Sequence, residues 1–415
     1  MPTKATIVLL SLTALLGTLL LPTGAGAQTF ELITDQNRNH APPGAMAGGW
    51  GPHLRSVMRS PAGELWFAYD EGPDVQHNHA IRYMRRTGGQ WIHAGFNDLT
   101  TIFGSRIQQN TAHVMVGTFI YSYGVDVDRR RLVECFLNTL VTSHKGCSDV
   151  VIGSQPYPLP SNTNYVGAAV SPGGFRIVWW SQVGAPGKLF HTWNFGGGWN
   201  GPVVTPAVIS GNSYANIGYL RPVFSSDNTL ELLGQMENSG FFVSTHVSIA
   251  IDNSYPQAVM GWIGPQSLTT FPEDIWADRQ GGLHAITHHQ SPSNTGAYFH
   301  KPAGGSWTFV QSFPGLTAAR FQEDDCGEIL HLLADSNGSL ILRSGSVAGH
   351  SGPLDFSQFS STQVQWPKST DLSQPNAIYT MSRAYQTQDV RGLHFALVGR
   401  SPAFDHQIFH FGDPD

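Results

Sequence analysis

Two histidines separated by a single residue, His77 and His79, stand near the start of the chain. In an extended segment alternate side chains point to the same side, so both imidazoles would face one surface. A neutral imidazole can transfer a proton near neutral pH and can also bind zinc. Two ligands do not complete a zinc site, so His53, His288 or His289 would have to converge on the pair from elsewhere. The pair is therefore a candidate for catalysis or for metal binding.

Arginine and tyrosine residues add the other groups needed for β-elimination from a uronic acid. An arginine can hold the carboxylate through two parallel hydrogen bonds, which makes the C5 proton more acidic. A histidine can remove that proton, and a tyrosine hydroxyl can protonate the departing glycosidic oxygen. His53 is an alternative base in this hypothesis, Arg106 an alternative partner for the carboxylate and Tyr219 an alternative acid. The predicted catalytic residues are His79, His113, Tyr165 and Arg221.

Further polar residues in the same kinds of segment are candidates for holding the substrate. They are His53, His77, Arg106, Asn164, Tyr219, Glu273, Asp274, His288, His289 and Arg320. A glycosidase with two carboxylates is an alternative. Adjacent residues of a strand point apart, however, so Glu273 and Asp274 alone cannot form that pair. Glycan binding without a reaction is a second alternative, because aromatic and polar loops can hold sugars.

Composition limits the partners of the protein. Charged residues make up 13% of the chain, against roughly a quarter in an average globular protein. The 23 Lys and Arg residues are outnumbered by 29 Asp and Glu residues. The short basic run 129–131 lies beside Asp126 and Asp128, as in a solvated turn. This composition indicates no nucleic acid as a partner. The predicted β-elimination, and not the composition, leads us to expect an acidic extracellular polysaccharide or oligosaccharide.

The N-terminal segment 1–27 has the layout of a signal peptide. Lys4 precedes an uncharged apolar run over 7–21, and Ala25-Gly26-Ala27 is a small-x-small cleavage site. The run is shorter than the roughly 20 residues that span a bilayer. We predict a mature chain of one domain, 28–415, that is secreted or periplasmic, monomeric and without a membrane span.

Three cysteines suit an exported protein that relies on a large core. Cys135 and Cys147 are close enough in sequence to close a small loop, and we expect a disulfide between them. Cys326 is then left over. A thiolate metal site is not expected, because no CxxC spacing occurs. The predicted reaction requires no cofactor. Bound structural calcium or zinc is the alternative.

A repeated hairpin runs along the mature chain. Each copy is an apolar extended run, a tight turn rich in Gly, Asp, Ser or Pro, and a second alternating run. The copies cover 53–72, 113–138, 165–182, 219–235, 274–289, 319–335 and 379–400. The second copy is predicted to turn near Asp128-Arg129. Trp91, Trp199 and Trp307 follow glycine-rich turns between the copies and suit the wide outer edge of a blade. Seven copies predict an all-β fold, a seven-bladed β-propeller with four antiparallel strands per blade, with six blades as the alternative.

Three second strands carry a common pattern, seen as GELWF at 63–67, GLHAI at 282–286 and GLHFAL at 392–397. This pattern resembles the Asp-box, or BNR, repeat of secreted carbohydrate-active propellers. That family includes sialidases, polysaccharide lyases of the ulvan-lyase type, rhamnosidases and lectins, so the resemblance implies a propeller and leaves the activity open. Its lyases work with His, Tyr and Arg groups. A sialidase- or rhamnosidase-like glycoside hydrolase is the alternative that the resemblance implies, although the N-terminal Arg-Ile-Pro signature of sialidases is absent here.

The hairpin pattern also sorts the histidines. His284 and His394 stand where the first hairpin has Trp66, which indicates a packing role, and His331 lies within one residue of that place. His191, His246 and His300 fall in outer strands and receive the same interpretation. The remaining histidines lie in loops that lead into first strands or join second to third strands. These loops share one rim of a propeller, where ligands bind over the central channel. We therefore expect the candidate residues on that rim.

Overall fold

The computed structural model describes residues 29–35, 57–71, 80–104, 111–126, 128–225, 229–238, 241–251, 257–264, 269–289, 295–324, 326–337, 339–364, 378–383, 393–400 and 406–412. Within them the regular structure is almost entirely β-strand, with one five-residue helix, α1 (Leu99–Phe103). None of the described helices is long and apolar enough to cross a membrane. The predicted signal peptide lies outside the described residues.

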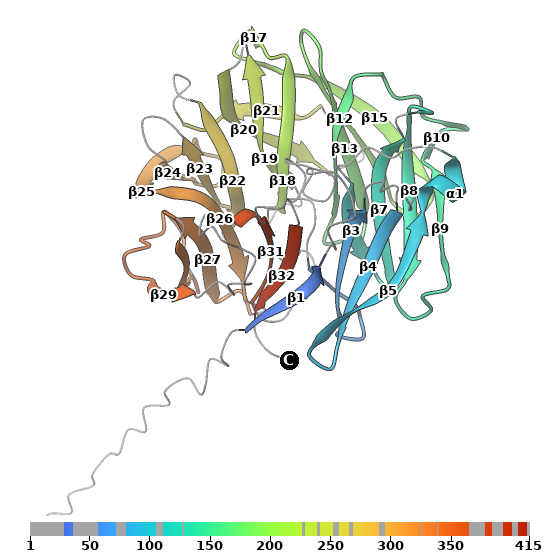
Figure 1. Cartoon of the computed structure of the whole chain (residues 1–415). Helices are drawn as coiled ribbons and strands as arrows, with labels where there is room; N and C mark the ends of the chain where they lie inside the picture. The colour runs from blue at the N-terminus through green and yellow to red at the C-terminus, as the bar shows by residue number, and fades with distance from the viewer. Residues whose placement is uncertain are drawn as a thin grey trace, which may run out of the picture.

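In the described part of the chain six antiparallel sheets have four strands each, and Figure 1 shows the sheets fanned around a common centre. Three of them are β2 (Met58–Arg59), β3 (Leu65–Glu71), β4 (Ala80–Thr87) and β5 (Gln90–Asp98); β6 (Ala112–Val116), β7 (Phe119–Asp126), β8 (Arg131–Asn138) and β9 (Lys145–Asp149); and β18 (Asn216–Phe224), β19 (Thr229–Asn238), β20 (Phe241–Ala250) and β21 (Val259–Trp262). The other three are β22 (Thr270–Ala277), β23 (Leu283–His289), β24 (Thr295–Lys301) and β25 (Thr308–Pro314); β26 (Leu316–Glu323), β27 (Ile329–Ser336), β28 (Ser339–Ser346) and β29 (Ser360–Val364); and β30 (Ile378–Arg383), β31 (His394–Arg400), β32 (His406–Gly412) and β1 (Thr29–Asp35).

A larger sheet departs from this form. It holds β12 (Thr163–Val170), β13 (Arg176–Gln182), β14 (Lys188–Asn194) and β15 (Trp199–Pro206), extended beyond β15 by β10 (Val151–Ile152) and β11 (Gln155–Pro156). A separate two-stranded sheet contains β16 (Val208–Ile209) and β17 (Asn212–Ser213). The expectation of seven equal four-stranded blades is therefore not met, because six sheets have that form and the remaining large sheet has six strands.

The first strands of the sheets form the inner wall. Contacts join β2 to β6, β6 to β12, β12 to β18, β18 to β22, β22 to β26 and β26 to β30. Within each four-stranded sheet the strands are paired in chain order, from the first strand outward, apart from the sheet that β1 completes. This meander delivers the start of every first strand to the same rim of the propeller.

The N-terminal strand β1 closes the ring as the outer neighbour of β32 (Figure 1). Glu31 on β1 accepts two hydrogen bonds from Arg86 of the first sheet, at 2.6 and 2.7 Å. Burial raises the pKa of Glu31, but hydrogen bonds from His410 and Arg86 outweigh it and hold that pKa at about 2. The ion pair therefore ties the last sheet to the first.

The three tryptophans predicted at the outer edges lie at the starts of fourth strands or just before them. Trp91 contacts His410, with ring centroids 5.6 Å apart. Trp199 contacts Tyr123 at 5.6 Å, and Trp307 contacts His246 at 5.4 Å. Each partner belongs to the preceding sheet of the ring, so these rings fill the space between neighbouring sheets as the sequence predicts.

Most first-to-second-strand turns follow the sequence prediction. Gly63, Gly174, Gly281 and Gly327 have left-handed φ angles of 86°, 81°, 82° and 63°, a conformation that suits glycine. The second hairpin is an exception. Its first turn lies between β6 and β7, at 117–118, whereas Asp128-Arg129 lies between β7 and β8. The error arose because the apolar run continues through the β6–β7 turn without a polar cluster.

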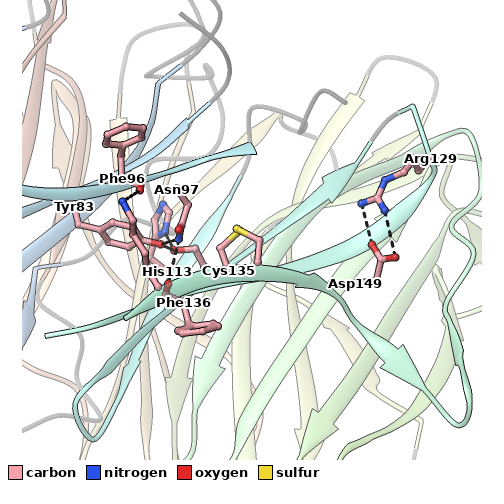
Figure 2. The surroundings of a disulfide bond; sticks show 11 residues. Tyr83, Phe96, Asn97, His113, Arg129, Cys135, Phe136 and Asp149 are labelled. Carbon is pink, nitrogen blue, oxygen red and sulfur yellow. Dashed lines mark hydrogen bonds and ion pairs between the residues drawn. A yellow bond between two sulfur atoms is a disulfide. The ribbon is translucent and has the colours of Figure 1, made fainter. Parts of the chain in front are cut away.

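Cys135 and Cys147 form the predicted disulfide, with an S–S distance of 2.01 Å. They lie directly opposite each other on β8 and β9, within one sheet (Figure 2). Cys326 is exposed and remains outside this bond, as predicted.

Candidate functional site

A β-bulge recurs near the start of the first strands. In β12, β18, β22, β26 and β30 the pairing with the second strand gains one extra residue. Tyr165 and Tyr219 lie at the bulges of β12 and β18, and Glu273 is the extra residue of β22. Bulges re-aim side chains and are frequent beside active sites. Three predicted site residues therefore occupy one repeated position of the fold.

The two tyrosines adopt an unusual backbone conformation at these bulges. Tyr165 has φ of 50° and Tyr219 has φ of 57°, and such angles in a non-glycine residue cost free energy. The Tyr165 hydroxyl donates a hydrogen bond to the Tyr219 hydroxyl at 3.3 Å, and the ring centroids are 4.9 Å apart. A Cβ on Gly218 would lie 2.6 Å from the Tyr165 ring. The missing side chain at Gly218 therefore makes room for the tyrosine pair.

Glu273 lies in the centre of a buried charge cluster. Its Oε1 is 2.6 Å from His288 Nδ1, and its Oε2 accepts a hydrogen bond from Arg320 Nη1 at 2.8 Å. Burial raises the pKa of Glu273, but His288, Arg320 and Arg221 outweigh it and hold that pKa at about 2. The ring of Phe271 stacks on His288 with centroids 5.2 Å apart. Glu273 is thus an ionised, saturated carboxylate and cannot serve as a general acid.

The arginines of this cluster are held by backbone as well as by charge. Arg221 Nη1 donates to the carbonyl of Pro272 on the neighbouring first strand. Arg320 Nη1 donates to the carbonyl of Glu273 at 2.7 Å. Asp274 accepts a hydrogen bond from the N–H of Phe321 at 2.8 Å, so it joins β22 to β26. Positive charge is therefore fixed at the inner wall, next to the start of the first strands.

His113 lies on β6 in a hydrogen-bonded network that is almost wholly buried. Its Nε2 is 3.0 Å from Thr111 Oγ1 and its Nδ1 is 2.8 Å from Ser122 Oγ. Ser122 lies 3.4 Å from the Tyr83 hydroxyl, which accepts a hydrogen bond from Asn97 at 3.0 Å (Figure 2). Both ring nitrogens are occupied, so His113 must exchange one of these bonds before it can accept a proton.

The structure brings together part of the predicted set. Tyr165 meets Tyr219, and Arg221, Glu273, His288 and Arg320 form the charge cluster. His289 is half-buried at the end of β23, and Asn164 is placed in β12 only by its backbone pairing with Ser181. Four predicted residues lie outside the described residues: His53, His77, His79 and Arg106.

Sequence reasoning missed the stacking ring of Phe271 and the glycine that accommodates the tyrosine pair. A signal for the bulges does exist. The third and fourth hairpins both begin with a tyrosine and an apolar residue, at 165–166 and 219–220. One extra residue in a strand reverses the inside–outside alternation after it, so aligning the copies by their turns would have shown the offset.

No protein-family model matches the chain, and no curated protein matches it in sequence. Solved structures do match. An ulvan lyase of polysaccharide lyase family PL25 aligns with a TM-score of 0.55 and 11% identity, over 93% of this chain and 96% of that one. The polysaccharide lyase Uly1 aligns with a TM-score of 0.54 and 12% identity, over 92% and 93%. The likeness is one of fold. It extends over nearly the whole of each chain.

Proposed function

We propose that this protein is a carbohydrate-active enzyme, a polysaccharide lyase that cleaves an acidic, uronate-containing glycan by β-elimination. The observation that carries the proposal is the hydrogen-bonded pair of Tyr165 and Tyr219, held by equivalent bulges beside the arginines of the inner wall. The PL25 ulvan lyase of the same fold has also been solved bound to -[GlcA(1-4)Rha3S]-. That ligand contains the sugar class on which the proposed chemistry acts.

The proposed reaction assigns one task to each group. Arg221 holds the substrate carboxylate and makes the C5 proton more acidic. A histidine, His79 or His113, takes this proton. The electron pair of the C5–H bond forms the C4=C5 double bond as the C4–O bond breaks. The hydroxyl of Tyr165 exchanges its hydrogen bond to Tyr219 for one to the departing oxygen, which it protonates. No cofactor is consumed in this sequence.

His79 is the stronger candidate for the base. The hydrogen bonds of His113 to Thr111 and Ser122 occupy both of its ring nitrogens. Breaking one of them in a dry interior costs about 1–3 kcal/mol. His113 therefore fits a positioning role on the inner wall, and His79 is left to act on the substrate.

The saturated Glu273 weighs against hydrolysis. A sialidase-like or two-carboxylate glycosidase needs a carboxylic acid that can give up a proton near neutral pH. The pKa of Glu273 is about 2 because His288, Arg320 and Arg221 overcome the effect of burial. This excludes Glu273 as the acid of a hydrolase and leaves Asp274 as the other candidate for that role.

The first experiment incubates the purified protein with a panel of uronate-containing polysaccharides. Elimination creates a conjugated double bond, so ultraviolet absorbance of the unsaturated uronate should rise as the chains shorten. New reducing ends without that absorbance would indicate a hydrolase, and binding without either would indicate a lectin. His79→Ala and His113→Ala are compared in the same assay. Wild-type rates in both variants would overturn the assignment of the base.

Several finer features belong to the same proposal. We infer that the six-stranded sheet serves as a seventh blade, since β12 contacts the first strands of both neighbouring sheets. The segment 1–27 directs export and is removed, which leaves a monomeric, secreted or periplasmic domain over 28–415. Size-exclusion chromatography of the exported protein tests the monomeric state, and N-terminal sequencing tests the removal of 1–27.

A further inference from the structure

A second cluster of titratable groups lies at the opposite end of the sheet β22–β25. It consists of Asp278, His284 and His300, whose potential ligand atoms all lie within 4.8 Å of one another. Asp278 directly follows β22, and His284 and His300 lie opposite each other on β23 and β24. Glu273 and His288 belong to the other end of the same hairpin. This cluster is therefore separate from the proposed catalytic site.

His300 directs an unsatisfied nitrogen into this cluster. The residue is 5% exposed, and its Nε2 has no hydrogen-bond partner among the described residues. A buried polar atom without a partner costs about 1–3 kcal/mol, so such an atom calls for an explanation. An ion that accepts its lone pair would supply one.

Gly282 keeps a space open between the three side chains. A Cβ on Gly282 would lie 2.4 Å from Asp278 Oδ2 and 3.2 Å from His300 Nε2. A carboxylate oxygen and the orphan nitrogen thus face the same point, and any side chain at Gly282 would fill it. Its φ angle lies outside the left-handed region, so backbone conformation does not account for a glycine here.

His284 is already oriented as a metal ligand. Its Nδ1 lies 2.6 Å from the Tyr298 hydroxyl, and that hydroxyl accepts a hydrogen bond from the N–H of Leu354 at 2.9 Å. Its Nε2 is then directed at Asp278 Oδ2, 3.2 Å away. Metal-binding histidines commonly have their second nitrogen fixed in this way, which sets the tautomer.

We propose that Asp278, His284 and His300 form a structural zinc site. Two imidazoles and one carboxylate are a donor set that suits zinc, with a water as the fourth ligand. Zinc at about 2.1 Å from each donor separates tetrahedral ligand atoms by about 3.4 Å. The pair of Asp278 and His284 is close to this spacing at 3.2 Å, and the ligand atom of His300 lies within 4.8 Å of both.

Zinc here would clamp the first three strands of one sheet. Asp278 closes the β22–β23 turn by accepting the N–H groups of Gln280 and Gly282 at 2.8 Å each. A bond from the same carboxylate through zinc to His300 reaches β24. A ligand that binds only the folded state stabilises it by mass action, so the metal would raise the melting temperature.

The experiment measures zinc in the purified full-length protein after dialysis against zinc and removal of the excess. Inductively coupled plasma mass spectrometry is expected to find one zinc ion per chain. The variants His300→Gln and Asp278→Asn should lose it. The matched control is His191→Gln, since His191 is another buried third-strand histidine with an unsatisfied nitrogen and, by the described contacts, no carboxylate partner.

Thermal unfolding gives a second measurement that does not depend on the variants folding. Zinc added to the chelator-treated wild type should raise its melting temperature by several degrees, and calcium at the same concentration should not. Wild-type protein that neither retains zinc nor is stabilised by it overturns the proposal. Retention of zinc by folded His300→Gln and Asp278→Asn also overturns it.

Discussion

The sheet β22–β25 carries a carboxylate–histidine pair at each end, and the two pairs have different surroundings. At one end Glu273 lies 2.6 Å from His288 and 2.8 Å from Arg320. At the other end Asp278 lies 3.2 Å from His284, and the nearby His300 has an unsatisfied nitrogen. A guanidinium completes the first cluster. The second cluster has the ligand atoms for a cation, but among the described contacts no positively charged arginine or lysine side chain is paired with Asp278.

The comparison shows how a carboxylate and a histidine are used differently at the two ends of one hairpin. Where Arg320 reaches across from the next first strand, the carboxylate becomes a fixed negative charge that joins two sheets. Where neutral imidazoles surround it, the carboxylate is left as a metal ligand. Whether the carboxylate becomes a fixed charge or a metal ligand depends on the residue that reaches it from the neighbouring sheet. The carboxylate–histidine pair alone does not determine it.

The largest expected effect follows from removing the guanidinium. Arg320→Met leaves the buried carboxylate of Glu273 without its guanidinium partner, which should lower the free energy of unfolding by about 3–5 kcal/mol. Asp278→Asn in metal-free protein should lower it by only about 1 kcal/mol, because an amide still accepts hydrogen bonds. Urea unfolding measures both. Arg320→Lys, which keeps the charge, serves as the control, and equal losses at the two ends would contradict the comparison.

The second prediction separates carboxylate from histidine by pH. The pKa of Glu273 is about 2 in the folded state against an ordinary 4.5. The unfolded chain then binds the proton more tightly, so this stability is complete above pH 4.5 and is lost as pH falls toward 2. Burial holds the pKa of His191 at about 4 against 6.5, so its contribution is lost between pH 6.5 and 4. Each shift corresponds to about 3 kcal/mol.

Urea midpoints measured across this pH range test the assignment. His191→Gln should flatten the slope of stability between pH 6.5 and 4 and leave the slope below pH 4 unchanged. An unchanged slope in the upper window would show that His191 is not the group that titrates there.

The sequence predicts the hairpins of the sheets better than it predicts the contacts between side chains of different sheets. Glycine turns and alternating apolar residues are local signals, so hairpins such as the one at Gly281 could be predicted from them. The disulfide between Cys135 and Cys147 was predictable for a similar reason, since few cysteines leave few pairings. The pairing of Glu273 with Arg320 spans two sheets, and no local pattern announces it.

The histidines of the second cluster show a different limit. The sequence indicates a packing role for His284, because tryptophan or histidine recurs at its place in the hairpin, and for His300, because it falls in an outer strand. Both are indeed buried, so burial was predicted correctly. Their convergence with Asp278 depends on which residues of β23 and β24 lie opposite each other. A shift of one residue in that register would direct the side chains to the other face.

The third prediction concerns the chemistry at the starts of the first strands. Tyr165→Phe removes the hydroxyl that donates to Tyr219, and turnover should fall roughly 100-fold. Zinc content should stay at the wild-type level because the two sites lie at opposite ends of the sheets. Tyr157→Phe is the matched control, since Tyr157 packs against Trp180 and no described contact joins it to Tyr165 or Tyr219. Wild-type turnover in Tyr165→Phe would remove this tyrosine from the proposed mechanism.

The smallest expected effects come from two glycines that keep space beside the two sites. Gly218→Ala places a Cβ 2.6 Å from the Tyr165 ring, and Gly282→Ala places one 2.4 Å from Asp278 Oδ2. Neither glycine has a left-handed φ, so the contact is the only strain introduced. Gly218→Ala should lower turnover roughly tenfold through misplacement of the tyrosine and leave zinc bound. Gly282→Ala should weaken zinc binding roughly tenfold and leave turnover unchanged. If each variant impaired both properties, the two ends of the propeller would be coupled, and the separation argued from the sheet β22–β25 would be wrong.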